Sequence, residues 1–238
     1  MRPIAGLVLA GVLAAACAGG GGAATAGPRI TVLAAASLTE AFEDLGRGQA
    51  VGYSFAGSQA VVAQVEAGAP VDVVATADGD AMARLERAGL VDRPRQFAHN
   101  RLAIAVAPGN PLRILALADL ARGGLKVVLA DPSVPAGRYA GQALDRAGVE
   151  VRPVSLELDV KAVARKVAAG EADAGIVYTT DVGRAGAVAI PDAANVVASY
   201  PVAVVRPTAH RGAAEAFVDR LLGLPGRATL AAHGFSLP

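Results

Sequence analysis

Two serines stand where the sequence turns from strand to helix, and their hydroxyls are the first groups that could do chemistry. Ser37 follows the apolar run 30–35, and Ser58 follows the run 53–56. The carboxyl edge of a parallel sheet is where ligands bind, and the first N–H groups of a helix there have no partner and lie at the positive end of its dipole. Both junctions therefore predict an anion site that needs no Lys or Arg.

Each serine also has a purely structural interpretation. The segment Ser37-Leu38-Thr39-Glu40 matches a capping box, in which side chains satisfy the free N–H groups of a helix start. Ser58 would likewise cap a helix that begins at Gln59. The presence of a hydroxyl at two successive junctions of one lobe favours a ligand site over caps alone.

A third junction lies in the segment Asp131-Pro132-Ser133-Val134-Pro135-Ala136-Gly137-Arg138-Tyr139. Its prolines and glycine fix a turn that exposes the N–H groups near Ala136, although a stiff loop before a good helix start would look the same. Arg138 could point inward and attract an anion, or outward as a solvated helix residue. The outward orientation is favoured, because arginine is mostly exposed.

The elements that must position these groups alternate between strand and helix. Strands are expected at 30–35, 53–56, 71–76, 126–130, 154–158 and 174–178, and helices at 38–45, 59–67, 81–88, 137–147, 160–169 and 212–222. Nearly all-apolar strands are typical of parallel-rich sheets with helices on both faces. The sequence therefore predicts an α/β fold.

Two uniformly apolar runs, 102–107 and 200–205, suit strands that cross between two lobes. We predict lobe one from residues 29–105 plus 203–238, and lobe two from residues 106–202. The C-terminal helix is expected to pack on lobe one.

The N-terminus carries a targeting segment. After Arg2, residues 4–16 form an apolar run that is short for a transmembrane helix, and Cys17 follows as the one cysteine of the chain. We predict a signal peptide at 1–16 and a flexible Gly/Ala-rich tether at 17–28. The order resembles a bacterial lipoprotein signal with an acylated Cys17, so we expect an exported, membrane-anchored protein at the periplasm or cell surface. The alternative is an ordinary signal peptide cleaved nearby.

Charge and composition exclude some partners. The 238 residues carry 22 Lys and Arg against 21 Asp and Glu, and removal of residues 1–16 takes away Arg2 and leaves 21 of each. Such a balance gives little attraction for nucleic acid. Aromatic residues make up 4% of the chain and Trp is absent, so platforms for stacking bases or sugars are scarce. A small, non-aromatic ligand is expected.

Five motifs occur in order from about residue 29 to residue 238. They are Ala34-Ala35-Ala36-Ser37-Leu38-Thr39, Gly68-Ala69-Pro70-Val71-Asp72 with Ala75-Thr76-Ala77-Asp78, Val134-Pro135-Ala136-Gly137-Arg138-Tyr139-Ala140, Gly175-Ile176-Val177-Tyr178 with Asp181, and Tyr200-Pro201-Val202-Ala203-Val204-Val205. Together these motifs resemble the periplasmic molybdate-binding proteins of molybdenum ABC importers.

The resemblance implies a type II periplasmic binding protein fold with a molybdate or tungstate dianion in the cleft between the lobes. The implied ligand-binding residues are Ser37, Ser58, Ala77, Ala136, Val160 and Tyr178. The three hydroxyls and the backbone N–H groups of Ser58, Ala77, Ala136 and Val160 would all donate. Molybdenum would be bound only as its oxyanion, with no further metal or cofactor, and the protein, a monomer, would deliver it to a membrane permease. An all-donor site suits a fully deprotonated oxyanion, which can only accept.

Other functions remain open. Sulfate, phosphate or an organic anion could take the place of molybdate. A metal-dependent hydrolase could use the carboxylates of Asp72, Asp78, Asp131, Asp159 and Asp181, although caps and turns explain them better. The histidines have no ligand spacing, and no nucleophile elbow, phosphate loop or Cys-x-x-Cys motif occurs, so no enzyme is expected. A DNA-linked sensor of the same fold conflicts with the export signal.

Overall fold

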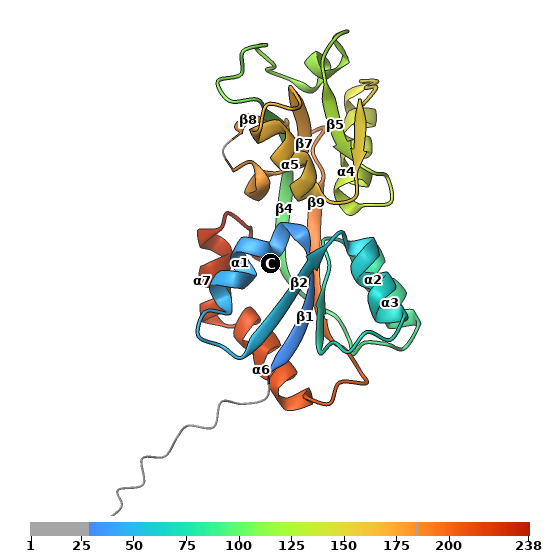
Figure 1. Cartoon of the computed structure of the whole chain (residues 1–238), viewed down its shortest axis with the longest axis vertical. Helices are drawn as coiled ribbons and strands as arrows, with labels where there is room; N and C mark the ends of the chain where they lie inside the picture. Colours follow the sequence, from blue (N-terminus) through green and yellow to red (C-terminus); the bar gives the residue numbers. More distant parts are fainter. Residues whose placement is uncertain (1–28, 184) are drawn as a thin grey trace, which may run out of the picture.

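The computed structural model describes residues 29–183 and 185–238, which fold into two α/β lobes (Figure 1). Lobe one lies at the bottom of Figure 1 and lobe two at the top, and two long strands, β4 (Arg95–Val106) and β9 (Val197–Val204), run between them. The predicted α/β fold is confirmed. The predicted signal peptide, tether and Cys17 lie outside the described residues. No helix in the described part is both long and apolar enough to cross a lipid bilayer.

Lobe one is a mixed sheet covered on both faces. β1 (Ile30–Ala35) pairs in parallel with β2 (Val51–Ala56) and β3 (Val73–Ala75), and β9 runs antiparallel to β3. Its helices are the 3-10 helix η1 (Ala36–Leu38), α1 (Thr39–Leu45), α2 (Ser58–Glu66), α3 (Gly79–Arg87), α6 (Arg211–Leu222) and α7 (Leu224–Ala232). In Figure 1, α2 and α3 lie on one side of the sheet and α1, α6 and α7 on the other.

Lobe two is built in the same way. β5 (Val127–Ala130) pairs in parallel with β6 (Ser155–Glu157) and β7 (Ala174–Tyr178). The antiparallel strands are β4 and β8 (Gly186–Ala189), of which β8 was not predicted. The helices of this lobe are α4 (Pro135–Ala147), α5 (Val160–Ala168) and the 3-10 helices η2 (Leu117–Ala121) and η3 (Thr179–Asp181).

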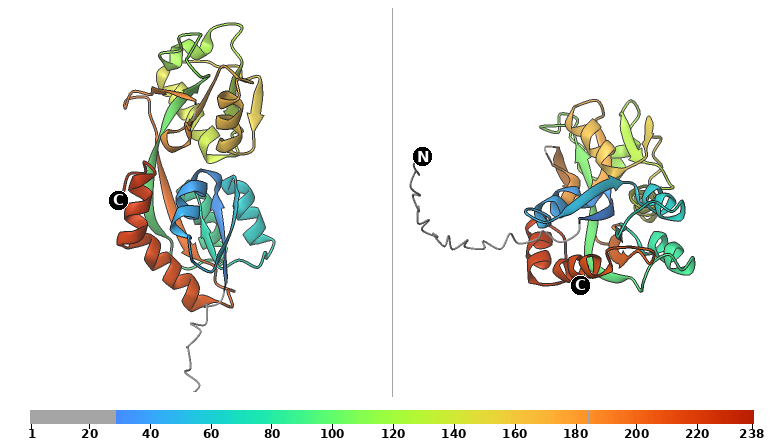
Figure 2. Two further views of the ribbon diagram at one scale, coloured as in Figure 1. Left: turned by 60° about the vertical axis from the view of Figure 1, so that its left-hand side comes forward. Right: turned by 60° about the horizontal axis from the view of Figure 1, so that its bottom comes forward.

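The crossing strand β4 changes partners as it passes between the lobes. Residues 95–101 pair with β9, whereas residues 102–106 pair with β7 and β8 of lobe two. By strand pairing the exchange comes at 101/102, four residues before the boundary expected at 105/106. The reason is that the apolar pattern of residues 102–107 marks a buried strand but not the sheet that buries it. Figure 2 shows β4 and β9 as the long connection between the lobes, with α6 and α7 beside lobe one.

The parallel pairing in lobe one brings the predicted site residues to one edge. Ala35 is level with Ala56 on β2, and Ala34 is level with Ala75 on β3. Because these strands end at the same edge of the sheet, the segments that follow them meet there. Ser37, Ser58 and Ala77 each stand two residues beyond the last residue of a strand, which is Ala35, Ala56 and Ala75 respectively.

The ends of α1 and α2 follow the local sequence pattern only in part. α2 ends at a glycine: Gly68 follows the cap residue Ala67, and its φ of +78° lies in the left-handed region that favours glycine. The capping box at Ser37 is wrong: Ser37 lies within η1, and the cap of α1 is Leu38, without a side-chain hydrogen bond. The cap of α2 is Gly57 and not Ser58. Both hydroxyls are therefore turned to other partners.

Candidate functional site

A small cavity lies between the lobes, at the edge where the strands end. Measured as the space open to the centre of a water-sized sphere, its volume is about 10 Å³, which is room for about one water molecule. No side chain in its lining is charged. The lining residues are Ala35, Ala36, Ala56, Gly57, Ser58 and Ala77 of lobe one and Val134, Pro135, Ala136, Val160 and Tyr178 of lobe two.

Five of the six predicted ligand residues line this cavity: Ser58, Ala77, Ala136, Val160 and Tyr178. The sixth, Ser37, is buried beside it, next to Ala36 of the lining. Ser37 lines an adjoining cavity of about 300 Å³ by the same measure, and its hydroxyl lies 3.0 Å from the hydroxyl of Tyr200. The structure thus brings the six residues to one place, while ligand binding by them stays a prediction.

Three helices begin at the cavity wall. α2 begins at Ser58, α4 at Pro135 and α5 at Val160. The first N–H groups of a helix have no acceptor within it, and the caps of α2 and α4 supply no side-chain acceptor either. The helix dipoles add positive potential at the same ends, worth about 0.3–1 kcal/mol each toward a nearby anion. The arrangement can attract an anion without a cationic side chain.

The hydroxyl of Tyr178 is the least satisfied group at the cavity. The residue is 1% exposed, and its phenolic oxygen has no hydrogen-bond partner in the described part of the chain. Burial raises the pKa of Tyr178 well above its ordinary value of 10, so the phenol keeps its proton. An unpaired buried donor costs about 1–3 kcal/mol unless a ligand accepts from it.

Ser58 and Ala77 meet at the lobe-one wall. The N–H of Ala77 donates to the Ser58 hydroxyl oxygen over 3.0 Å. Because that oxygen accepts, the hydroxyl proton of Ser58 is available to another acceptor. The pairing joins two of the predicted donors, which follow different strands of the sheet.

Polar contacts close the lobes around the cavity. The Gln59 side-chain amide donates to the carbonyl oxygen of Leu158 over 3.0 Å, and Arg138 forms an ion pair with Asp78. The expectation that Arg138 points outward is wrong. Its guanidinium reaches across the cleft because the Asp78 carboxylate, with 2% of its side chain exposed, needs a counter-charge.

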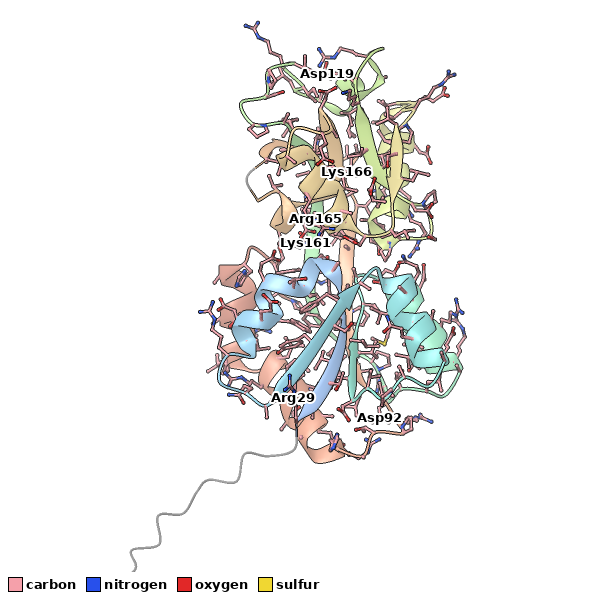
Figure 3. The ribbon with its side chains drawn as sticks, in the orientation of Figure 1. Arg29, Asp92, Asp119, Lys161, Arg165 and Lys166 are labelled. Atoms are coloured by element: carbon pink, nitrogen blue, oxygen red, sulfur yellow. The ribbon has the colours of Figure 1, made fainter. Side chains whose placement is uncertain are left out.

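A second ion-pair network, which sequence reasoning missed, joins the lobes near the adjoining cavity. Lys161 of α5 lies 2.7 Å from a Glu40 carboxylate oxygen of α1 and 2.9 Å from Asp181. Figure 3 places Lys161 at the end of lobe two that faces lobe one. Burial raises the pKa of Asp181 to about 6 against the opposing effect of Lys161. No sequence signal marked Lys161, because its partners come from distant segments.

The aspartates of the hydrolase alternative have separate structural partners. Asp72 accepts from the Thr31 N–H and His210, Asp78 caps α3, Asp131 accepts from Ser133, Asp159 caps α5, and Asp181 pairs with Lys161. Within residues 29–183 and 185–238, no three His, Cys, Asp or Glu side chains gather as a metal site would require.

Comparison with known proteins places this site in context. A family model described as bacterial extracellular solute-binding protein matches residues 30–236. The chain is 40% identical over 227 residues to the molybdate-binding protein ModA of Mycobacterium tuberculosis, covering 90% of this chain and 87% of that protein. It is 32% identical over 235 residues to the protein of the same name from Escherichia coli, covering 88% and 89%.

Solved structures share the architecture. The periplasmic molybdate-binding protein of Azotobacter vinelandii superposes with a TM-score of 0.77 at 23% identity, over 88% of this chain and 99% of that one. At this identity the likeness shows a common fold.

Proposed function

The chain belongs to the bacterial extracellular solute-binding proteins, and from this premise we propose that it binds molybdate, and with it tungstate, between its lobes. We propose further that it delivers the oxyanion to the membrane permease of an ABC importer. The names of the Mycobacterium tuberculosis and Escherichia coli relatives support molybdate as the ligand. The oxyanion is the cargo of this protein, so the proposal includes no cofactor and no catalytic step.

One observation carries the choice of ligand: the phenolic hydroxyl of Tyr178 is buried at the cavity without an acceptor. The other groups offered there are the Ser58 hydroxyl and N–H groups at helix starts. A fully deprotonated dianion accepts from all of them, whereas a protonated phosphate would bring a donor that meets no acceptor. Sulfate is also an all-acceptor anion, so cavity size must separate it from molybdate.

Binding and closure are one event in this proposal. The donors belong to both lobes, so an oxyanion contacts all of them only when the lobes are together. Its affinity for the closed form then exceeds its affinity for an open form, and this difference drives closure. The pair Arg138–Asp78 and the pair Lys161–Glu40 form at the same time, because each joins one lobe to the other. The closed form is the one we propose the permease recognises.

We also propose that the protein acts outside the cytoplasm as a monomeric lipoprotein. Family membership supports export. The finer statement, that Cys17 is acylated and anchors the chain to a membrane, rests on the apolar run 4–16 before it and the Gly/Ala-rich segment after it.

Isothermal titration calorimetry tests the ligand. Purified protein is titrated with molybdate, tungstate, sulfate and phosphate at one pH and ionic strength. We expect tight one-to-one binding of molybdate and tungstate and little heat from sulfate or phosphate. If only sulfate or phosphate bound, that anion would replace molybdate as the proposed ligand, and the proposed closure of the lobes around it would stand. Absence of binding by all four anions would contradict the proposed function.

A further inference from the structure

Tyr200 lies directly behind the proposed site, on the crossing strand β9. It is fully buried, and its ring packs edge-on against Tyr178, with centroids 5.9 Å apart, and against Phe235 at 5.4 Å. Phe97 of β4 packs against the same ring at 6.2 Å. These neighbours hold the ring in place. Its hydroxyl lies 3.0 Å from the hydroxyl of Ser37.

The direction of this hydrogen bond follows from the acceptors present. Burial raises the pKa of Tyr200 above its ordinary value, so the phenol keeps its proton and must donate it. Asn100 also neighbours the Tyr200 hydroxyl. Its amide oxygen already accepts from the Thr179 hydroxyl and from the Arg101 N–H, each over 2.9 Å. Asn100 therefore offers Tyr200 donors. The Tyr178 hydroxyl also neighbours that of Tyr200, but burial keeps its proton on it as well. The Ser37 oxygen, 3.0 Å away, is the acceptor at hydrogen-bond distance.

We propose that Tyr200 is a positioning residue for the oxyanion site: it donates its hydroxyl proton to the oxygen of Ser37 and thereby turns the Ser37 proton toward the ligand. This inference rests on the proposed function. A hydroxyl has one proton and two acceptor lone pairs. When Tyr200 donates to one lone pair, the Ser37 proton is left free to be donated to the anion. Ser37 and Tyr178 then both present hydroxyl donors to the ligand. A residue of the crossing strand β9 thus fixes the direction in which the Ser37 hydroxyl points.

The arrangement also bears on ligand choice. Without the Tyr200 proton, the Ser37 hydroxyl can rotate and donate to another group, and its oxygen can then accept from a protonated ligand. Tyr200 thus disfavours monohydrogen phosphate as well as supporting molybdate, because it occupies one of the two lone pairs of Ser37 that could accept the ligand's proton. A residue that served only the packing of β9 would change the binding of both anions in the same direction.

A double-mutant cycle tests the proposal. Molybdate affinity is measured by calorimetry for the wild type, Ser37→Ala, Tyr200→Phe and the double variant, with thermal unfolding to check folding. We expect Tyr200→Phe to weaken binding by about 2- to 10-fold in the wild-type background, in line with one net hydrogen bond. In the Ser37→Ala background it should change affinity by less than about twofold, because its effect passes through Ser37. Phosphate binding relative to molybdate should rise in Tyr200→Phe alone.

The matched control is Tyr53→Phe, which removes another buried phenolic oxygen of lobe one that has no partner in the described chain. It should leave affinity unchanged. Equal weakening by Tyr200→Phe in both backgrounds, or none in the wild-type background, would overturn the proposal. A wild type that binds no oxyanion would instead contradict the proposed function.

Neutron diffraction of the unliganded protein decides the proton direction even if Tyr200→Phe does not fold. We expect a deuteron on the Tyr200 oxygen that points at Ser37. A deuteron on Ser37 that points at Tyr200 would refute the inference.

Discussion

At the scale of single residues, the proposed site depends on hydroxyl groups whose protons are free to be donated to an anion. Ser58 accepts from the Ala77 N–H, and its own proton is left for the ligand. We expect Ser58→Ala to weaken molybdate binding by about 10- to 100-fold, because a hydrogen bond to a charged group contributes about 1.5–3 kcal/mol. Calorimetry measures the loss. Ser54→Ala, an exposed serine on the preceding strand, is the control and should bind as the wild type does.

Tyr178 predicts the response of binding to pH. Its pKa lies well above 10 because of burial, and a bound dianion raises it further, since a phenolate would repel the anion. The donor therefore persists through the alkaline range. We expect molybdate affinity to stay level from about pH 7 to about pH 9. A loss of affinity in that range that disappears in Tyr178→Phe would show that the phenol titrates there and would contradict the prediction.

Most residues of the candidate site could be named from the sequence, but the hydrogen bonds and ion pairs that they form could not. Strand-to-helix junctions and the family resemblance named Ser58, Ala77 and Tyr178, which the structure brings to one cavity, while ligand binding by them stays a prediction. The local pattern at Ser37 also fitted a capping box, which does not form, and the hydroxyl partner of Ser37, Tyr200, is 163 residues away. Lys161 had no local signal for the same reason. Contacts between distant segments depend on packing, which spacing along the chain does not encode.

At the scale of elements, the start of α4 depends on one glycine. A Cβ at Gly137 would lie 2.1 Å from the carbonyl oxygen of Asp131, so the helix could not keep its place against the loop. We expect Gly137→Ala to lower the free energy of unfolding by about 1–3 kcal/mol, as overpacking does, and to weaken molybdate binding by shifting the Ala136 N–H. Urea unfolding and calorimetry measure the two effects.

Gly141 supplies a control on the same helix. A Cβ there meets nothing within 4 Å, so Gly141→Ala should raise the free energy of unfolding by about 0.5–1 kcal/mol. If both alanine variants changed the free energy of unfolding equally, helix propensity alone would explain the effect of Gly137→Ala, and a clash with Asp131 would be excluded.

Elements with strong local patterns were predicted well. The helices after β2, β3 and β5 appear near their expected positions, because apolar spacing and helix-stopping glycines are local features. β8 and α7 were missed. β8 is four residues long, and its residues alternate between partly buried and exposed. Its sequence is therefore too short to predict a strand. The crossing role of β4 and β9 was anticipated, but the residue of exchange depends on tertiary pairing.

At the scale of the whole molecule, the ion pair Arg138–Asp78 favours the closed form. Asp78 is buried there, and a carboxylate without its counter-charge would gain by returning to water in an open form. We expect Arg138→Met to weaken molybdate binding by about tenfold, and the double variant with Asp78→Asn to recover part of the loss. Small-angle X-ray scattering of the unliganded Arg138→Met variant should give a larger radius of gyration than that of the wild type, because the lobes are apart more often.

Arg87→Met removes an exposed charge from α3 and is the control for net charge. Unchanged affinity in Arg138→Met would exclude a role for this ion pair in closure.

The proposed acylation of Cys17 predicts the cellular fraction in which the protein is found. If Cys17 carries the lipid, Cys17→Ser should move the protein from the membrane fraction to the soluble extracytoplasmic fraction. Molybdate affinity of the purified protein should be unchanged, because the proposed binding residues lie beyond residue 28. Fractionation followed by immunoblotting measures the shift. Equal membrane association of both forms would contradict acylation at this cysteine.

Both ends of the described chain belong to lobe one: Arg29 leads into β1, and Pro238 follows α7 (Figure 1). The chain enters lobe two along β4 and returns along β9, so lobe two is an insertion carried on two strands. Mechanically, a pull applied at the amino end is borne by lobe one and does not pass through the crossing strands. A protein held at a membrane surface by that end would carry the tension in lobe one and leave lobe two free to move toward it and away from it.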